Sequence, residues 1–231
     1  MPLPHRKDSP PLLEARGLTR RDHTTGAALL GDISLRLDRG DRVALIGPTG
    51  SGKTLLLRAL AGLDPLDGGE VAFRGTLVPP SQMPAFRRQV IYLHQHPALF
   101  DGTVADNLAR PFQLDSHAGR QLDTAWLRQA LRGYGREDTF LERSVTRLSG
   151  GERQVVALLR AVQLQPAVLL LDEPTASIDE AAGRYVESLV AEWANADPER
   201  AWLWVTHDLS QAARVSGHVW RMERGQLTQS A

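Results

Sequence analysis

The sequence has no cysteine among its 231 residues, which excludes disulfides, thiolate zinc sites and iron–sulfur clusters. It also lacks any run of roughly 20 apolar residues, the length that a helix needs to cross a bilayer. Its longest apolar runs are short, such as 167–171. The stretch 1–11 is rich in proline and charge and has no apolar centre, so it is expected to be a flexible tail and not a secretory signal. We therefore expect a cytoplasmic protein that reaches a membrane only through a partner.

The chain carries no excess charge of either sign, because 27 lysines and arginines balance 27 aspartates and glutamates. This balance argues against a nucleic-acid partner bound through a broad basic face. Hydrophobic residues make up 42% of the chain and charged residues 23%, which is ordinary for a packed globular protein. The length allows one large or two small domains.

Short apolar runs of strand length alternate with longer helical patterns. Strands are predicted at 42–46, 89–93, 167–171 and 201–205. The leucine-rich segment 53–61 predicts a helix, and apolar residues recur at helical spacing over 155–162 and 178–193. Strands separated by helices predict an α/β fold with a parallel sheet.

The stretch 97–147 differs from its surroundings, because it lacks strong β-forming runs. Its helical patterns are broken by Pro111, Gly119, Gly133 and Gly135. We expect a helical insertion and not a separate domain. A single domain over 12–231 would then have a core at about 12–95 and 161–231 and a helical subdomain at about 96–160.

A glycine-rich loop follows the first predicted strand and fits the P-loop pattern G-x-x-x-x-G-K-[ST]. Its residues are Gly47, Pro48, Thr49, Gly50, Ser51, Gly52, Lys53 and Thr54. Glycines let successive backbone N–H groups point at phosphate oxygens, and the following helix directs its positive end at the same anion. In this pattern Lys53 reaches the β- and γ-phosphates of a nucleotide, and the Thr54 hydroxyl binds Mg²⁺.

The predicted strand near 167–171 ends in two carboxylates, Asp172 and Glu173. Ligands of α/β sheets bind at the carboxyl ends of the strands. Asp172 is expected to hold Mg²⁺, and Glu173 to polarise the water that attacks the phosphate. A solvated acidic turn would explain this pair if it stood alone, but the upstream P-loop favours the functional interpretation.

The segment Leu148-Ser149-Gly150-Gly151-Glu152-Arg153-Gln154 resembles the signature motif of ABC ATPases, usually written LSGGQ. A serine and glycines at a helix start can simply cap the helix, but they can also bind an anion. In the family that anion is the γ-phosphate of ATP held by the other subunit. Glu152 replaces the common glutamine, a departure that we expect to leave the phosphate contacts of Ser149, Gly150 and Gly151 intact.

Three further family motifs follow in the expected order, and the resemblance covers about residues 12–229. Gln95 resembles the Q-loop glutamine, which links Mg²⁺ and the attacking water to the membrane partner. Ser177-Ile178-Asp179 resembles the D-loop, which crosses the dimer interface. His207 resembles the switch histidine that contacts the γ-phosphate.

The resemblance implies a P-loop NTPase core with a small antiparallel β portion near the N-terminus. It implies ATP and Mg²⁺ as cofactors, with Thr54, Gln95 and Asp172 at the metal. Lys53, Gln95, Glu173 and His207 would carry out hydrolysis. The functional unit would be a head-to-tail homodimer with ATP sandwiched at the interface, bound to an integral membrane permease on the cytoplasmic face of the inner membrane.

The run HPALFDGTVADNL and the segment 202–208 resemble a small bacterial subfamily implicated in iron export and metal stress. ABC importers of phosphate or amino acids share much of this pattern, so an importer remains an alternative. A soluble ABC ATPase acting on a macromolecular complex is a second alternative, disfavoured by the single ATPase unit, the missing coiled coil and the neutral charge. An ATP sensor without hydrolysis is a third, disfavoured by Glu173 and His207.

One family element is missing, the aromatic ring that stacks on adenine. The matching stretch is Arg20-Arg21-Asp22-His23. His23 or an arginine could stack on the base instead. The alternative is a loosely held base, and we predict weak discrimination between ATP and GTP.

His94 and His96 flank Gln95, but two histidines alone rarely hold a transition metal firmly. We therefore expect them to be polar residues of the loop around Gln95. The tryptophans Trp193, Trp202 and Trp204 are expected to be packing residues. A third group, Pro97, Leu99 and Phe100, either packs on the helical insertion or forms the family's groove for a permease helix. The sequence favours neither of these last two interpretations.

Overall fold

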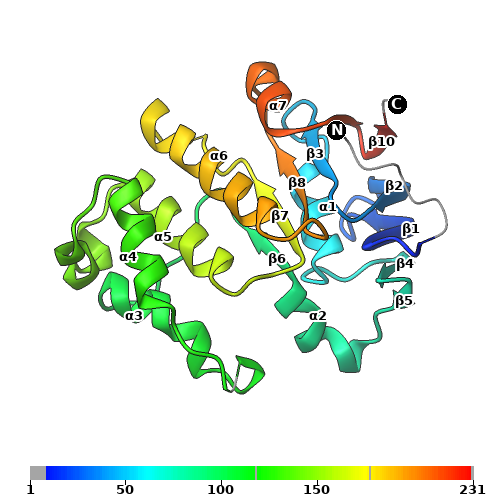
Figure 1. The fold of residues 1–231 in the computed structure, drawn as a ribbon. Helices are drawn as coiled ribbons and strands as arrows, with labels where there is room; N and C mark the ends of the chain where they lie inside the picture. Colours follow the sequence, from blue (N-terminus) through cyan, green and yellow to red (C-terminus); the bar gives the residue numbers. More distant parts are fainter. Residues whose placement is uncertain (1–8, 118, 177, 230–231) are drawn as a thin grey trace.

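The computed structural model describes residues 9–117, 119–176 and 178–229, arranged as two sheets with helices around them (Figure 1). The smaller sheet is antiparallel and has the order β2-β1-β4-β5. Its strands are β1 (Leu13–Arg21), β2 (Ala28–Leu37), β4 (Gly68–Phe73) and β5 (Thr76–Leu77). The antiparallel β portion expected near the N-terminus is confirmed.

The larger sheet has the order β10-β9-β3-β8-β7-β6. Its strands are β3 (Arg42–Ile46), β6 (Val90–Leu93), β7 (Val168–Asp172), β8 (Ala201–Val205), β9 (His218–Glu223) and β10 (Gln226–Gln229). Only β10 pairs antiparallel, so the other five strands end at one common edge. The four predicted strands are confirmed, two of them with a shift of one residue.

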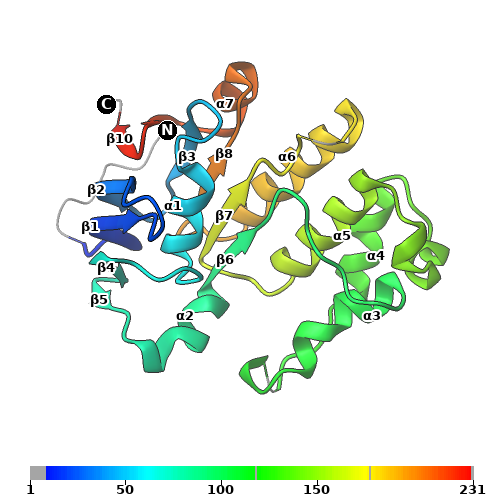
Figure 2. The same ribbon diagram turned by 180° about the vertical axis from the view of Figure 1, so that it is seen from behind.

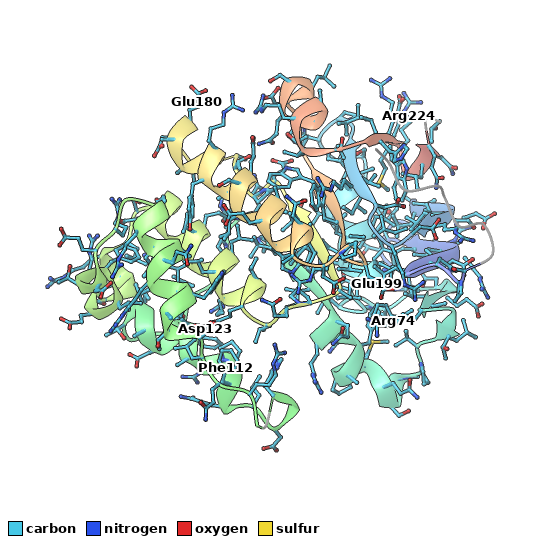
Figure 3. All side chains as sticks on the ribbon, in the orientation of Figure 1. Arg74, Phe112, Asp123, Glu180, Glu199 and Arg224 are labelled. Carbon is cyan, nitrogen blue, oxygen red and sulfur yellow. The ribbon has the colours of Figure 1, made fainter. Side chains whose placement is uncertain are left out.

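Seven α-helices are found in the part of the chain that the structure describes. They are α1 (Lys53–Leu60), α2 (Met83–Gln89), α3 (Val104–Ala109), α4 (Thr124–Gly133), α5 (Gly150–Val162), α6 (Glu180–Asn195) and α7 (Leu209–Val215). Short 3-10 turns occupy much of the chain between α3 and α5. The predicted helical texture of 97–147 is therefore confirmed, and these elements lie to one side of the large sheet (Figure 2). Figure 3 shows Phe112 and Asp123 on this helical part, far from Arg224.

Alternating residues of β8 face two separate cores, as the period of two in a strand requires. Ala201, Leu203 and Val205 belong to the core between the two sheets. Trp202 and Trp204 belong to the core beneath α5 and α6, where Trp193 also packs. These tryptophans are at most 3% exposed, and the indole N–H of Trp202 donates to the Val215 carbonyl at 3.0 Å. Their predicted packing role is confirmed.

The first described residues are held on the small sheet. Pro11 is buried, and Leu12 donates its N–H to the Leu37 carbonyl at 3.0 Å. Arg36 donates to the carbonyl oxygen of Ser9 at 2.9 Å. Of the segment 1–11 expected to be a tail, residues 1–8 lie outside the described residues, and 9–11 are part of the folded structure.

Candidate active site

The parallel topology collects four loops at one edge of the large sheet. Loop 47–52 follows β3, Gln95 follows β6, Glu173 follows β7 and His207 follows β8. Because parallel strands present their carboxyl ends at the same edge, these residues come together although they are far apart in the sequence.

Loop 47–52 needs glycine at positions where no side chain fits. Gly47 has a φ of 152°, and a Cβ there would lie 2.1 Å from the Met222 carbonyl oxygen. Gly52 has a φ of 102° in the left-handed region, and its Cβ would meet the Met222 side chain at 2.8 Å. The loop is thus pressed against β9 while its backbone curls in the way that a phosphate cradle requires.

Lys53, the first residue of α1, turns its ammonium group back into this loop. Its Nζ donates to the carbonyl oxygens of Gly47 at 2.8 Å and Pro48 at 3.0 Å, and the residue is only 6% exposed. Burial lowers the pKa of Lys53, and the Glu173 and Asp172 carboxylates offset this only in part. A buried cation that its surroundings destabilise is suited to receiving an anionic ligand.

Asp172 is the last residue of β7 and is 3% exposed. Its Oδ2 accepts a hydrogen bond of 2.9 Å from the hydroxyl of Tyr92 on the adjacent strand β6. Burial and the Asp172 charge raise the pKa of Tyr92, so the hydroxyl stays protonated and donates. Tyr92 thereby fixes the orientation of the carboxylate.

Glu173 lies between two of the other predicted site residues. Its Oε2 accepts from the Gln95 amide at 3.1 Å, and its Oε1 pairs with Nε2 of His207. The backbone of Glu173 has a φ of 47°, in the left-handed region that non-glycine residues rarely adopt. The structure therefore brings Gln95, Glu173 and His207 into one cluster, with the Glu173 carboxylate at its centre.

The loops that carry Glu173 and His207 are tied to each other by a buried amide. Gln211 on α7 donates to the Thr175 hydroxyl at 2.9 Å and to Oε1 of Glu187 on α6 at 2.8 Å. Arg214 completes this network with a 3.0 Å contact to the same Glu187 oxygen. Asp208 caps α7 by accepting from the N–H of Ser210. Thr175, two residues after Glu173, and the helix after His207 are thus held in one arrangement.

Ser149 is the N-cap of α5 and forms a capping box with Glu152. The Ser149 hydroxyl accepts from the Glu152 N–H at 3.2 Å, and the Ser149 N–H donates to Oε2 of Glu152 at 2.8 Å. Gly150 borders a cavity of about 420 Å³ that Gln95 and Glu173 also line. Within one copy, the start of α5 therefore faces the Gln95–Glu173 pair across this cavity.

Asp179 is the N-cap of α6 and accepts from the Ala182 N–H at 2.9 Å. A second cavity, of about 370 Å³, is lined by Asp179 together with Glu173 and His207. Ile178 lies against Gly151, where a Cβ would approach the Ile178 side chain to 3.2 Å. Ser177, the first residue of the predicted D-loop, lies outside the described residues.

The residues predicted to hold Mg²⁺ fit a cation that takes most of its ligands from water and phosphate and few from the protein. Among the described residues, no three His, Cys, Asp or Glu side chains gather as a metal cluster. Asp172 has one carboxylate oxygen bonded to Tyr92, and Thr54 is exposed one residue beyond the loop lysine. Mg²⁺ ordinarily binds through one or two protein oxygens plus substrate phosphates and water, which matches this donor set.

The two histidines that flank Gln95 are bonded to each other. The Nδ1 of His94 accepts a hydrogen bond from the His96 N–H at 2.9 Å, so this nitrogen is already occupied.

The stretch that should hold an adenine-stacking ring is bonded to a neighbouring turn. The Arg21 N–H donates to Asp67 at 2.6 Å, and the Asp22 carboxylate accepts from the N–H groups of Thr24 and Thr25. His23 is 72% exposed and lies 3.8 Å from Asp67. Asp22 is therefore occupied in a turn, while the His23 ring is exposed beside Asp67.

Some functional contacts had no signal in the sequence. In the sequence, Tyr92 stood out only as part of a predicted strand, and no motif pointed to Gln211, which lies beyond the switch histidine.

Leu99 packs against the helical core, whereas Phe100 is 50% exposed beneath the guanidinium groups of Arg110 and Arg160. The packing of Leu99 on the helical insertion is thus confirmed, and a groove for a permease helix at Pro97 and Phe100 stays a prediction.

Comparison with known proteins found a matching family and several similar proteins. The sequence model of the family described as ABC transporter matches residues 30–176. The Escherichia coli (strain K12) "Probable iron export ATP-binding protein FetA" is 37% identical over 182 residues, which span 79% of each chain. The Bordetella pertussis "Sulfate/thiosulfate import ATP-binding protein CysA" is 36% identical over 221 residues, 94% of this chain but 61% of that protein.

Solved structures with this fold include one described as the ATP-binding subunit of an ABC transporter. It has a TM-score of 0.84 and 24% identity, and the match covers 95% of this chain and 90% of that one. A dimeric ATP-binding cassette bound to ADP and Pi in a post-hydrolysis state has a TM-score of 0.80 and 23% identity, covering 94% and 98%.

The fold and the clustered loops define a P-loop NTPase. The chain belongs to the ABC transporter family, as one of its ATP-hydrolysing, ATP-binding proteins. No helix in the described ranges is both long and apolar enough to cross a membrane.

Proposed function

We propose that this chain powers a separate integral membrane permease by hydrolysing ATP. The observation that carries the proposal is the placement of Glu173 between the Gln95 amide and the His207 imidazole, at the sheet edge that also bears loop 47–52. This arrangement supplies a carboxylate base for water beside a phosphate cradle.

In the proposed reaction, the backbone N–H groups of loop 47–52 and the Lys53 ammonium bind the phosphates. Lys53 exchanges its contacts with the Gly47 and Pro48 carbonyls for phosphate oxygens. Glu173 accepts a proton from the attacking water, while Gln95 and His207 orient that water and the γ-phosphate. Thr54, Asp172 and Gln95 would hold Mg²⁺, which when bound would supply positive charge beside the phosphates.

We propose a head-to-tail homodimer in which Ser149, Gly150 and Gly151 of one copy bind the γ-phosphate held by loop 47–54 of the other. The capped start of α5 supports this role, because it presents backbone N–H groups at a helix terminus. Asp179, beside the same cavity as Glu173 and His207, would lie at the interface. ATP would join the two copies, and hydrolysis would separate them.

For the partner, we propose a permease at the cytoplasmic face of the inner membrane, and no nucleic acid. The 37% identity to the protein named for iron export favours export of iron or another metal. A solute importer is the second candidate, because proteins named for sulfate import are nearly as similar and match more of the chain. Substrate contacts would lie in the permease.

The test is to capture tagged Glu173→Gln protein with Mg²⁺-ATP from solubilised membranes of its host and to identify the retained proteins. We expect a multi-span membrane protein above background. Wild-type protein should release phosphate from ATP only with Mg²⁺. Retention of soluble partners alone would favour a non-transport ABC ATPase, and Mg²⁺-independent or absent phosphate release would contradict the ATPase mechanism.

We predict weak discrimination between ATP and GTP. In the stretch 20–23, where the family has its adenine-stacking ring, the exposed ring is that of His23. Stacking on this ring should distinguish adenine from guanine poorly, because every base offers a π-face. Turnover measured at equal concentrations should differ by less than about fivefold between the two nucleotides. An ATP preference much above that range would show that another group recognises adenine.

A further inference from the structure

The signature segment carries a buried carboxylate, because Glu152 stands where the family usually has glutamine. Its side chain is 7% exposed. Besides the Ser149 N–H, it contacts two guanidinium groups, Arg143 at 2.9 Å and Arg136 at 3.2 Å. Burial acts to raise the pKa of Glu152, but the Ser149 hydrogen bond and the two arginines outweigh it and leave the pKa below its ordinary value. Glu152 is therefore ionised at neutral pH.

Both arginines come from the helical part and are held by aromatic rings. Arg136 lies over the ring of Tyr134 at 5.0 Å and over Phe140 at 5.9 Å. Arg143 lies over the same Phe140 ring at 5.4 Å, and Phe140 is 2% exposed. Cation–π contacts of this kind hold the two guanidinium groups beside Glu152, although the side chains of Arg136 and Arg143 are 39% and 43% exposed.

The charge of Glu152 matters because of what the same turn is proposed to bind. Its carboxylate is bonded to the N–H of Ser149, the residue that would contact a γ-phosphate. A lone carboxylate there would repel that phosphate, whereas one carboxylate with two guanidinium groups leaves a net charge of about +1. An amide at this position would need no such compensation.

We propose that Arg136 and Arg143 are positioning residues that neutralise Glu152, so that a signature segment with glutamate can bind the ATP of a second copy. The proposal rests on the composite ATP site of the proposed function. It predicts that the arginines are required only while residue 152 is charged.

The experiment measures the dimer dissociation constant with Mg²⁺-ATP in the Glu173→Gln background, by analytical ultracentrifugation. Arg136→Ala with Arg143→Ala should weaken the dimer at least about tenfold. Adding Glu152→Gln to this pair should recover most of the loss. The matched control is Arg128→Ala with Arg132→Ala, which removes two exposed arginines that pair with the exposed Asp138. This control should change the constant less than about twofold.

Thermal unfolding of each monomer separates folding from charge compensation. If the double variant does not fold, Arg143→Ala alone replaces it with the same readouts. An undiminished dimer in the folded arginine variants would overturn the proposal, as would a folded triple variant that dimerises no better than the double. Failure of the Glu173→Gln parent itself to dimerise with ATP would instead overturn the proposed function.

Discussion

Replacing Glu173 with glutamine is expected to lower ATP turnover by roughly 10²–10⁴-fold while leaving ATP binding intact. The amide keeps the size of the side chain and one acceptor oxygen for Gln95 or His207, but it cannot accept a proton from water. The variant should therefore accumulate as an ATP-bound dimer of twice the 25.4 kDa chain mass. Light scattering after size exclusion, with Mg²⁺-ATP and with Mg²⁺-ADP, measures this directly.

Glu199→Gln provides the matched control for this variant. Glu199 is 59% exposed and precedes β8, whereas His207 follows that strand, so the two residues lie at opposite edges of the sheet. The control should hydrolyse ATP like the wild type and stay monomeric after turnover. Near wild-type hydrolysis by Glu173→Gln would show that another group acts as the base.

Replacing Lys53 with alanine is expected to weaken ATP binding roughly 10–100-fold, because a hydrogen bond to a charged group contributes about 1.5–3 kcal/mol. Turnover should fall below detection. Stability should not fall, since burial lowers the pKa of Lys53 and thus disfavours its charged form in the folded state. Calorimetric titration with ATP and thermal unfolding together measure both effects.

The scarcity of lysine gives this prediction an independent readout, because Lys7 and Lys53 are the only two in the chain. An amine-directed reagent followed by peptide mass spectrometry should label Lys53 in the free protein and lose that label when ATP is added. Lys7→Ala is the control variant and should bind ATP normally. Equal ATP affinity in Lys53→Ala and wild type would contradict the role of Lys53 in the phosphate site.

Short motifs with a strict local geometry could be predicted from the sequence. The loop after β3 was predictable because only glycine fits where a Cβ would strike the Met222 carbonyl oxygen. The buried strands were predictable because parallel strands covered on both faces read as continuous apolar runs, as β7 and β8 do. The grouping of Gln95, Glu173 and His207 followed from the carboxyl ends of these strands.

Contacts between distant side chains could not be predicted in this way. The bond from Tyr92 to Asp172 depends on the register that places Tyr92 opposite Leu170. The pairing of Glu152 with Arg136 and Arg143 depends on how turns of the helical part fold over α5. Neither register nor turn packing leaves a periodic pattern in the sequence, so glutamate at position 152 looked like an isolated departure.

The most direct test of the account asks whether each ATP lies between two copies of the chain. Because the chain has no cysteine, Thr49→Cys and Arg147→Cys can be made as two separate proteins, both in the Glu173→Gln background. Both positions are exposed, one in the phosphate loop and the other just before the signature segment. The account predicts that a short bismaleimide yields a covalent dimer only when both proteins are mixed, with Mg²⁺-ATP and not with ADP. No cross-link in the mixture, or equal cross-linking by either protein alone, would contradict the head-to-tail ATP site.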